Sequence, residues 1–159
     1  MKLKYLQSEF GGCVYYCWAN IFDDGELLHN MKLGAYHVDA RRIVEKQIPG
    51  NTLIHLALHS ETMFPITSFE FPKPVGKDQY CCYTIVVESN RLGYRHYIFA
   101  LIDCYNEMTL FDPYIDEGVR MAPKDLFNRY AVYEIETICS DSGTMYFVFN
   151  KQDFRHLEM

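Results

Sequence analysis

Two apolar stretches joined by a polar turn are the clearest pattern in the second half of the chain. The first stretch begins at His96, the second ends at Asp112, and polar residues 103–107 separate them. Short apolar runs bounded by turn residues are typical of β-strands, and Pro113 cannot continue a strand ladder. A hairpin of this length folds the end of its second strand back beside the start of its first. The pattern therefore predicts that Asp112 lies next to His96.

A second apolar run, from Cys13 to about Phe22, is compatible with a helix and directly follows Gly11 and Gly12. Glycine lets the backbone turn tightly into a helix because it has no Cβ atom. The polar residues Asp23-Asp24-Gly25 interrupt the run at its other end. The sequence therefore predicts a helix that begins at Cys13.

The remaining pattern predicts further strands and short helices, with proline and glycine marking the turns between them. In chain order we expect a helical stretch over 26–47, a turn over 48–51, a strand or helix over 52–59, an irregular loop or edge strand over 60–77, a strand over 80–88, a turn over 90–93, a short helix over 123–130, and strands near 131–138 and 144–150. Helices followed by an antiparallel sheet form an α+β fold. A chain of 159 residues is expected to form one domain, residues 1–159.

Charge and composition narrow the classes of function. The net charge is −6 and the 15 basic residues form no long cluster, which argues against a nucleic-acid partner. No apolar run reaches the length of about 18 residues that a membrane span needs, and residues 1–6 lack the apolar core of a signal peptide. We therefore expect a cytoplasmic protein, or an effector secreted without a cleavable signal peptide. The oligomeric state stays open.

The six cysteines show no paired CxxC spacing, and a disulfide framework is not expected in a chain of this size without a signal peptide. Four of them are expected to be buried thiols, namely Cys81, Cys82, Cys104 and Cys139. Adjacent residues on a strand face opposite sides of its sheet, so Cys81 and Cys82 should point apart.

Two pairs have spacings that suit metal ligands. Cys13 and Cys17 stand four residues apart on the predicted helix and could join a zinc site, but no matching second ligand pair is evident. His55 and His59 have the same spacing, but they lack the intervening glutamate of a zinc peptidase. We therefore expect neither a metal nor an organic cofactor.

Cys13 has the surroundings of a nucleophile. The amides and the dipole of a first helical turn favour a thiolate over a thiol, whose ordinary pKa is about 8.5. Gln7 stands six residues earlier, where its side-chain amide could donate to an oxyanion. His96 could serve as the base, and Asp112 could orient its ring. Cys17 is the competing nucleophile, although it lies one turn further along, where the effect of the dipole has faded.

The order of Gln7, Cys13, Cys17, His96-Tyr97 and Asp112-Pro113 resembles the papain-like cysteine peptidases. It is most similar to the bacteriocin-processing peptidases that cut double-glycine leaders, and to their stand-alone relatives. The tail over 118–127 also resembles the strand and short helix that follow the aspartate in that family. The resemblance spans residue 7 to about residue 130, and residues 25–90 match only in general order.

Two features depart from that family. Val14 stands where the family usually has glycine, directly after the nucleophile. Cys17-Trp18-Ala19 matches papain, in which Trp-Ala directly follows the nucleophile. Cys17 therefore remains an alternative nucleophile.

The resemblance implies a papain-like fold, in which N-terminal helices pack on an antiparallel sheet. It implies a thiol-dependent hydrolase of peptide or amide bonds, with Cys13, His96 and Asp112 as the triad, Gln7 as oxyanion donor, and a protein or peptide as substrate. The same chemistry could serve a glutamine deamidase or an acyltransferase. A catalytically inactive binding module is a further alternative, and the replacement of the usual glycine by Val14 points toward it.

Overall fold

The fold is built on an antiparallel sheet, and helices pack on the sheet. The computed structural model describes residues 1–9, 11–29, 31–32, 37–47, 52–60, 64–88, 95–140 and 148–158. Within these residues the strands follow the order β1-β6-β2-β3-β4-β5, and β7 pairs with β2 outside this path. The strands are β1 (Thr52–His59), β2 (Gln79–Glu88), β3 (Arg95–Ile102), β4 (Met108–Phe111), β5 (Val119–Met121), β6 (Ala131–Ser140) and β7 (Val148–Asn150). Every pairing between them is antiparallel.

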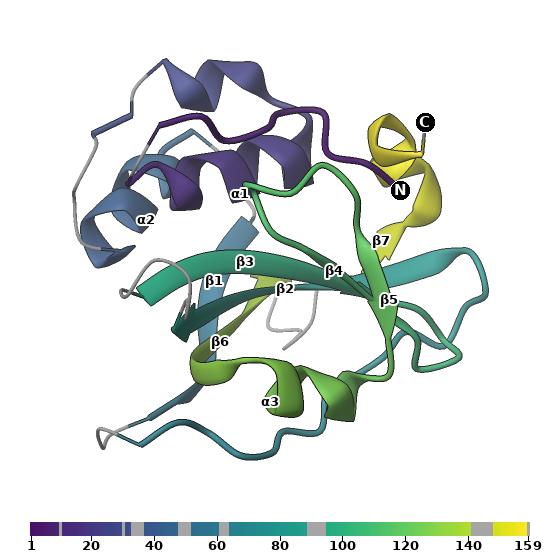
Figure 1. The fold of residues 1–159 in the computed structure, drawn as a ribbon. Coiled ribbons are helices and arrows are strands. Elements are labelled where there is room, and N and C mark those ends of the chain that lie inside the picture. The colour runs from purple at the N-terminus through teal and green to yellow at the C-terminus, as the bar shows by residue number, and fades with distance from the viewer. Residues whose placement is uncertain are drawn as a thin grey trace.

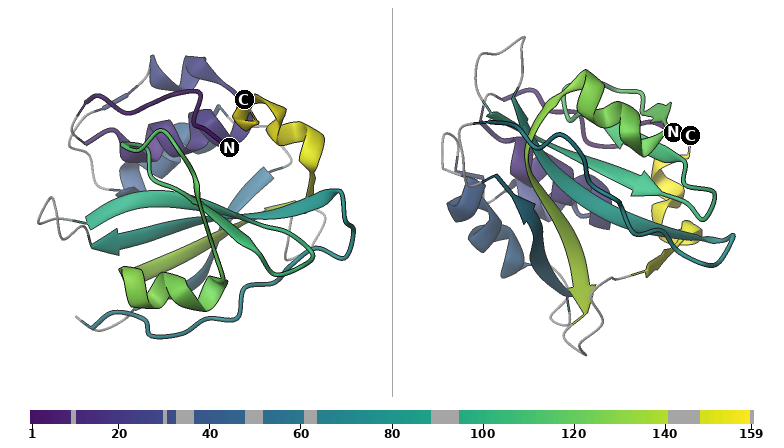
Figure 2. Two further views of the ribbon diagram at one scale, coloured as in Figure 1. Left: turned by 45° about the vertical axis from the view of Figure 1, so that its right-hand side comes forward. Right: turned by 90° about the horizontal axis from the view of Figure 1, so that it is seen from below.

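Helices cover one face of the sheet, while a short helix and an irregular segment cover the other (Figures 1 and 2). The helices are α1 (Cys13–Phe22), η1 (Gly25–Leu28), α2 (His37–Glu45), η2 (Pro123–Asp125), α3 (Leu126–Arg129) and η3 (Lys151–Leu157), where η marks a 3-10 helix. Helix α1 packs against β3 and α2, whereas α3 and residues 64–78 lie on the opposite side. The chain ends meet, because the Lys2 N–H donates to the Leu157 carbonyl at 2.7 Å. No helix in the described ranges is long and apolar enough to cross a membrane.

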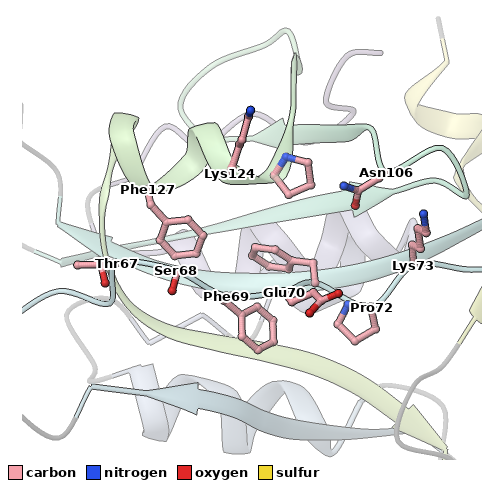
Figure 3. A pocket seen from close by; sticks show the side chains of 11 residues that line it. Thr67, Ser68, Phe69, Glu70, Pro72, Lys73, Asn106, Lys124 and Phe127 are labelled. Carbon is pink, nitrogen blue, oxygen red and sulfur yellow. The ribbon is translucent and has the colours of Figure 1, made fainter.

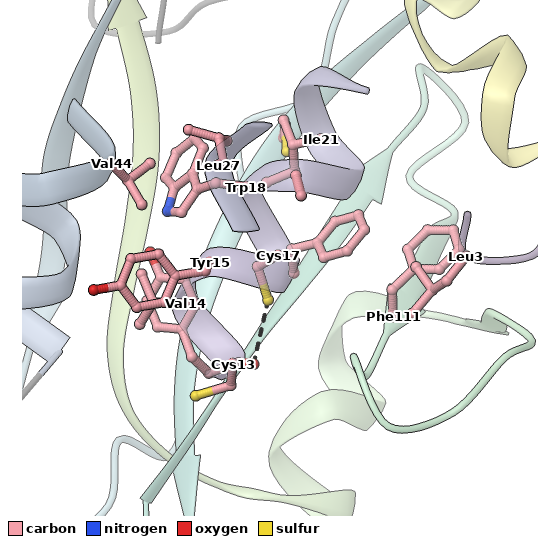
Figure 4. Packing of buried hydrophobic residues seen from close by; sticks show 14 of the residues in the cluster. Leu3, Cys13, Val14, Tyr15, Cys17, Trp18, Ile21, Leu27, Val44 and Phe111 are labelled. Atoms are coloured by element: carbon pink, nitrogen blue, oxygen red, sulfur yellow. Dashed lines mark hydrogen bonds between the residues drawn. The ribbon is translucent and has the colours of Figure 1, made fainter. Parts of the chain in front are cut away.

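Two hydrophobic cores form because both faces of the central strands are covered. On β2, Cys82 belongs to the core under α1, and Cys81 belongs to the core under α3, as their adjacency predicts. Trp18 of α1 is fully buried in the first core and stacks on Phe22 with ring centroids 5.7 Å apart (Figure 4). Full burial of a large apolar side chain stabilises a fold by about 1.5–3 kcal/mol. Helix α1 is joined to the first part of β3 by the hydrogen bond from the Cys17 thiol to the Tyr97 carbonyl.

A buried polar network attaches α2 to the sheet. Arg41 of α2 forms ion pairs with Glu134 and Glu136, which are neighbours on one face of β6. The Glu136 carboxylate also accepts hydrogen bonds from the Thr84 and Tyr97 hydroxyl groups. Burial raises the pKa of Glu136, against the opposing effect of the Arg41 guanidinium. The network therefore depends on Arg41 to compensate a carboxylate that water cannot reach.

Most of the predicted elements are present with shifted ends. Helix α1 and the hairpin of β3 and β4 match their predictions, and residues 52–59 are a strand rather than a helix. A single helix over 26–47 is wrong, because the Asp24 side chain caps the short turn η1 and α2 begins separately at His37. Helix η3 follows β7 and is not predicted. The predicted turns over 48–51 and 90–93 lie outside the described residues, as do residues 144–147 of the last predicted strand.

Candidate functional site

Helix α1 begins at Cys13, directly after the glycine pair Gly11 and Gly12. Gly11 has a φ of 85°, a backbone conformation that residues other than glycine rarely adopt. A Cβ atom on Gly12 would lie 3.2 Å from the Met31 sulfur, so a larger residue would require the Met31 side chain to shift slightly. The first helical hydrogen bond runs from the Tyr16 N–H to the Gly12 carbonyl at 3.2 Å, and the N-cap residue is Gly12, which has no side chain that could cap the helix. Cys13 therefore stands in the first turn, where the helix dipole favours an anion.

Cys17 lies one turn further along and has a different environment. Its thiol is fully buried and donates to the Tyr97 carbonyl at 3.3 Å, as Figure 4 shows with a dashed line. Burial raises the pKa of the Cys17 thiol well above its ordinary value. The Cys13 sulfur lies at the start of the helix, at the end of the packed cluster. Cys13 is also buried, at 5% exposed, so burial alone does not separate the two thiols. Cys17 has a raised pKa and bonds a backbone carbonyl, whereas Cys13 lies beside His96, and this difference favours Cys13 as the nucleophile.

The hairpin brings His96 and Asp112 together. Their Nε2 and Oδ1 atoms lie 2.7 Å apart, and both side chains are largely buried. Strand register explains the approach: Phe99 pairs with Phe111, so Asp112 falls just past the end of β4, diagonally across from His96. The Tyr114 N–H donates to the same Asp112 oxygen at 3.0 Å, which holds the carboxylate in place. The juxtaposition predicted from strand length is therefore present.

Tyr114 is a residue of the site that the sequence analysis missed. Its ring stacks on the His96 imidazole with centroids 5.4 Å apart and planes inclined by 27°. Continuing the register of Phe99 with Phe111 by three residues pairs His96 with Tyr114. Extending the register of the predicted hairpin in this way could have identified Tyr114 from the sequence. Tyr114 covers the imidazole on one side and favours its cationic form through the face of the aromatic ring.

The His96 imidazole has surroundings that favour its protonated form. Burial lowers its pKa, but the hydrogen bond to Asp112 and the nearby Cys13 thiol outweigh burial and raise the pKa to about 9. Its Nδ1 atom is buried and has no well-aligned hydrogen-bond partner in the described part of the chain. Because Asp112 occupies Nε2, Nδ1 is the nitrogen left to exchange a proton with the thiol.

Gln7 lies between the Asp112 turn and the start of α1. Its backbone N–H donates to the Pro113 carbonyl at 2.7 Å, and its side chain is only 5% exposed. The side-chain Nε2 donates to the Glu9 carbonyl at 2.7 Å, and Tyr16 of α1 donates its hydroxyl to the Glu9 carboxylate. A primary amide carries two N–H groups, so one remains for another acceptor. Tyr16 and Glu9 therefore hold the Gln7 amide relative to the first turn of α1.

The other candidate metal ligands do not assemble within the described residues. No group of three or more His, Cys, Asp or Glu side chains in this part of the chain could hold a metal ion. The imidazole of His59 pairs with Glu134 at 3.1 Å. The side chain of His55 lies outside what the structure describes.

Three further cysteines have described side chains. Cys81 and Cys82 are buried thiols, and burial raises the pKa of Cys81 to about 11. Cys104 differs from its predicted burial and is only half-buried, because it lies in the turn between β3 and β4. The side chain of Cys139 lies outside the described residues. Among Cys81, Cys82 and Cys104, whose side chains the structure describes, no thiol has the helix start or the histidine that accompany Cys13.

The geometry thus joins three elements at one place: the first turn of α1, the first residues of β3, and the turn after β4. These elements bring Cys13, His96, Asp112 and Gln7 together, and they add Tyr114. The arrangement provides a thiol, an imidazole, a carboxylate and a side-chain amide. Comparison of the chain with protein-family models, with curated proteins and with solved structures finds no match in any of the three.

Proposed function

We propose that this chain is a thiol-dependent hydrolase of peptide or amide bonds, built on a papain-like plan. Cys13 is the nucleophile, His96 carries the proton, Asp112 orients the imidazole, and Gln7 donates to the oxyanion. The observation that carries the proposal is the position of His96, which is bonded to Asp112 at 2.7 Å and has its pKa raised through Cys13 as well. A histidine that couples a thiol to a largely buried carboxylate is an arrangement that activates a cysteine nucleophile.

In the acylation step, the Cys13 thiolate attacks the carbonyl carbon, so that a C–S bond forms and the carbonyl oxygen takes the electron pair. The tetrahedral intermediate then collapses, the C–N bond breaks, and the His96 imidazolium gives its proton to the leaving nitrogen. A raised pKa suits His96 to this donor role at neutral pH. In deacylation, His96 takes a proton from water, the resulting hydroxide attacks the thioester, and the Cys13 thiolate leaves.

The developing oxyanion needs donors that are already in place. The backbone N–H groups in the first turn of a helix have no carbonyl partner within that helix, and Cys13 begins α1. The second N–H of the Gln7 amide is the side-chain donor, with the Glu9 carbonyl holding the first at 2.7 Å. Removing one donor of this kind typically lowers kcat by about 10²–10³-fold.

The fold is consistent with the family resemblance in its coarse plan. A helix with cysteine at its start precedes an antiparallel sheet that carries histidine and then aspartate. The departure at Val14 is accommodated, because its side chain is buried in the core under α1. Val14 therefore packs against the rest of the fold, and it gives no specific reason to prefer an inactive module.

Mass spectrometry of peptides and proteins incubated with the chain tests this proposal. We expect cleavage of backbone amide bonds that disappears with Cys13→Ala and persists with Cys104→Ser, which removes a thiol outside the site. Conversion of glutamine side chains to acids would assign the same site to deamidation. Transfer of an acyl group to an amine would assign it to acyl transfer. Products that persist with Cys13→Ala, or no product from any substrate, would contradict a Cys13 enzyme.

A further inference from the structure

A groove of about 490 Å³ crosses the sheet face opposite α1 (Figure 3). One wall is the irregular segment 67–73, and the other is formed by η2 and α3. Asn106, from the turn between β3 and β4, closes one end. Because β3 begins beside His96 and ends before that turn, this end of the groove lies at the opposite end of the strand from the candidate catalytic site.

Aromatic side chains form the floor of this groove. The Phe69 and Phe71 rings pack edge to face with centroids 4.8 Å apart, and Phe127 of α3 lies 6.2 Å from Phe71. Phe71 is anchored in the second core, where its ring packs on Tyr83 at 5.0 Å. The floor is therefore fixed by the fold, and its Phe69 and Phe127 side chains stay partly exposed to the groove.

The backbone along the segment wall is the unusual feature. Its ends are attached: the Ile66 N–H donates to the Val132 carbonyl at 2.7 Å, and Tyr83 donates its hydroxyl to the Pro72 carbonyl. Between them, no N–H or C=O group of residues 67–71 has a hydrogen bond within the described part of the protein. Such a run, held between two anchors, leaves backbone donors and acceptors with which an extended peptide can pair, as an added strand pairs with a sheet edge.

Charge on the rim indicates what such a strand carries. Lys73 lies on the segment wall and Lys124 on the opposite wall, and both are exposed. Glu70 is the acidic residue among those that line the groove, so the lining has an excess of positive charge in a chain whose net charge is −6. An acidic side chain on the occupant would be placed between two lysines.

We propose that this groove binds an extended peptide segment by strand addition along residues 67–71. The bound segment places aromatic or aliphatic side chains on the floor made by Phe69 and Phe127, and acidic side chains toward Lys73 and Lys124. Alternate residues of an extended chain point to opposite sides, so apolar and acidic residues alternate in the preferred ligand. The proposal does not depend on the thiol site, because none of these residues belongs to it.

Binding of defined peptides tests the proposal on the full chain. The probe is a library of fluorescein-labelled hexapeptides, blocked at both ends, in which one position at a time is fixed, and binding is read by anisotropy. We expect the tightest pools to alternate apolar and acidic residues. Phe127→Ser should weaken the selected peptide by about tenfold or more. Val75→Ser, which changes a side chain 97% exposed outside the groove, should leave its affinity unchanged.

Two further measurements distinguish strand addition from nonspecific binding of apolar peptides. N-methylation of single peptide amides should abolish binding only at alternate positions, because one edge of a strand pairs with every second residue. Lys73→Glu together with Lys124→Glu should shift the preference from acidic to basic pools. The proposal is overturned if no pool binds, if Phe127→Ser binds like the native chain, or if N-methylation has no alternating pattern. Using Cys13→Ala as the host chain keeps these results separate from any turnover.

Discussion

His96 Nε2 and Asp112 Oδ1 lie 2.7 Å apart, and the stacked ring of Tyr114 covers the imidazole that this bond orients. The bond joins the start of β3 to the turn after β4, so a single hairpin positions both groups. Gln7 reaches the same turn through the Pro113 carbonyl, which links the hairpin to the segment that leads into α1. The candidate site is therefore built around one strand pair and one helix start.

This bond makes stability depend on pH. The pKa of His96 is raised to about 9 in the folded chain, against 6.5 for an ordinary histidine, so its protonated form stabilises the fold. The contribution should be complete below about pH 6.5 and disappear as pH rises through about 9, a loss of at most about 3 kcal/mol. Urea unfolding at pH 6 and pH 9.5, compared with His96→Gln, measures it. His29→Gln, which changes an exposed histidine, is the control, and an equal gap between native chain and His96→Gln at both pH values would refute this linkage.

Tyr114 should act on His96 through its ring. Tyr114→Leu removes the aromatic face and should lower the His96 pKa by roughly half a unit, since a cation beside an aromatic face gains about 0.5–1 kcal/mol. Tyr114→Phe keeps the ring and should restore the native titration. NMR titration of the His96 ring protons reads this directly and requires no substrate. If the two variants titrate alike, Tyr114 does not position or stabilise the imidazolium.

Gln7 should matter to the transition state more than to substrate binding. Gln7→Ala should lower kcat by about 10²-fold with little change in KM, because the oxyanion exists only in the transition state. Gln7→Glu keeps the size of the side chain without its N–H donors and should show a similar loss. Gln47→Ala, two residues after α2, is the matched glutamine control. A lower melting temperature with unchanged kcat would reduce Gln7 to a structural residue.

Arg41 should contribute more to the stability of the fold than its neighbour Arg42. Arg41 is 13% exposed and pairs with two carboxylates, whereas Arg42 is 73% exposed and lies 4.0 Å from Asp39. Arg41→Ala leaves Glu136 buried without its cation and should cost about 3–5 kcal/mol of unfolding free energy. Arg42→Ala should cost less than about 1 kcal/mol. Urea unfolding of both variants at pH 7 compares them, and similar costs would show that the network does not depend on Arg41.

The parts of the site that follow from local rules could be predicted from the sequence. Glycines before an apolar run place Cys13 at a helix start, and two strands of known length place Asp112 beside His96. Tyr114 was missed because its contact with His96 depends on continuing the strand register three residues beyond the end of β4. The Arg41 network joins α2 to β6, far apart in the chain, and no local pattern reports such a pairing. The groove was missed because it depends on how an irregular segment lies across the sheet.

The most direct test of the account is the alkylation of each cysteine by iodoacetamide at pH 6, followed residue by residue with mass spectrometry. A thiolate at Cys13 paired with the His96 imidazolium predicts that Cys13 reacts first, faster than the half-buried Cys104. The rate at Cys13 should stay nearly level from pH 6 to pH 8 and should fall by about tenfold or more at pH 6 in His96→Gln. Faster labelling of Cys104 or Cys17, or a Cys13 rate that rises with an ordinary thiol pKa of about 8.5, would contradict the proposed nucleophile.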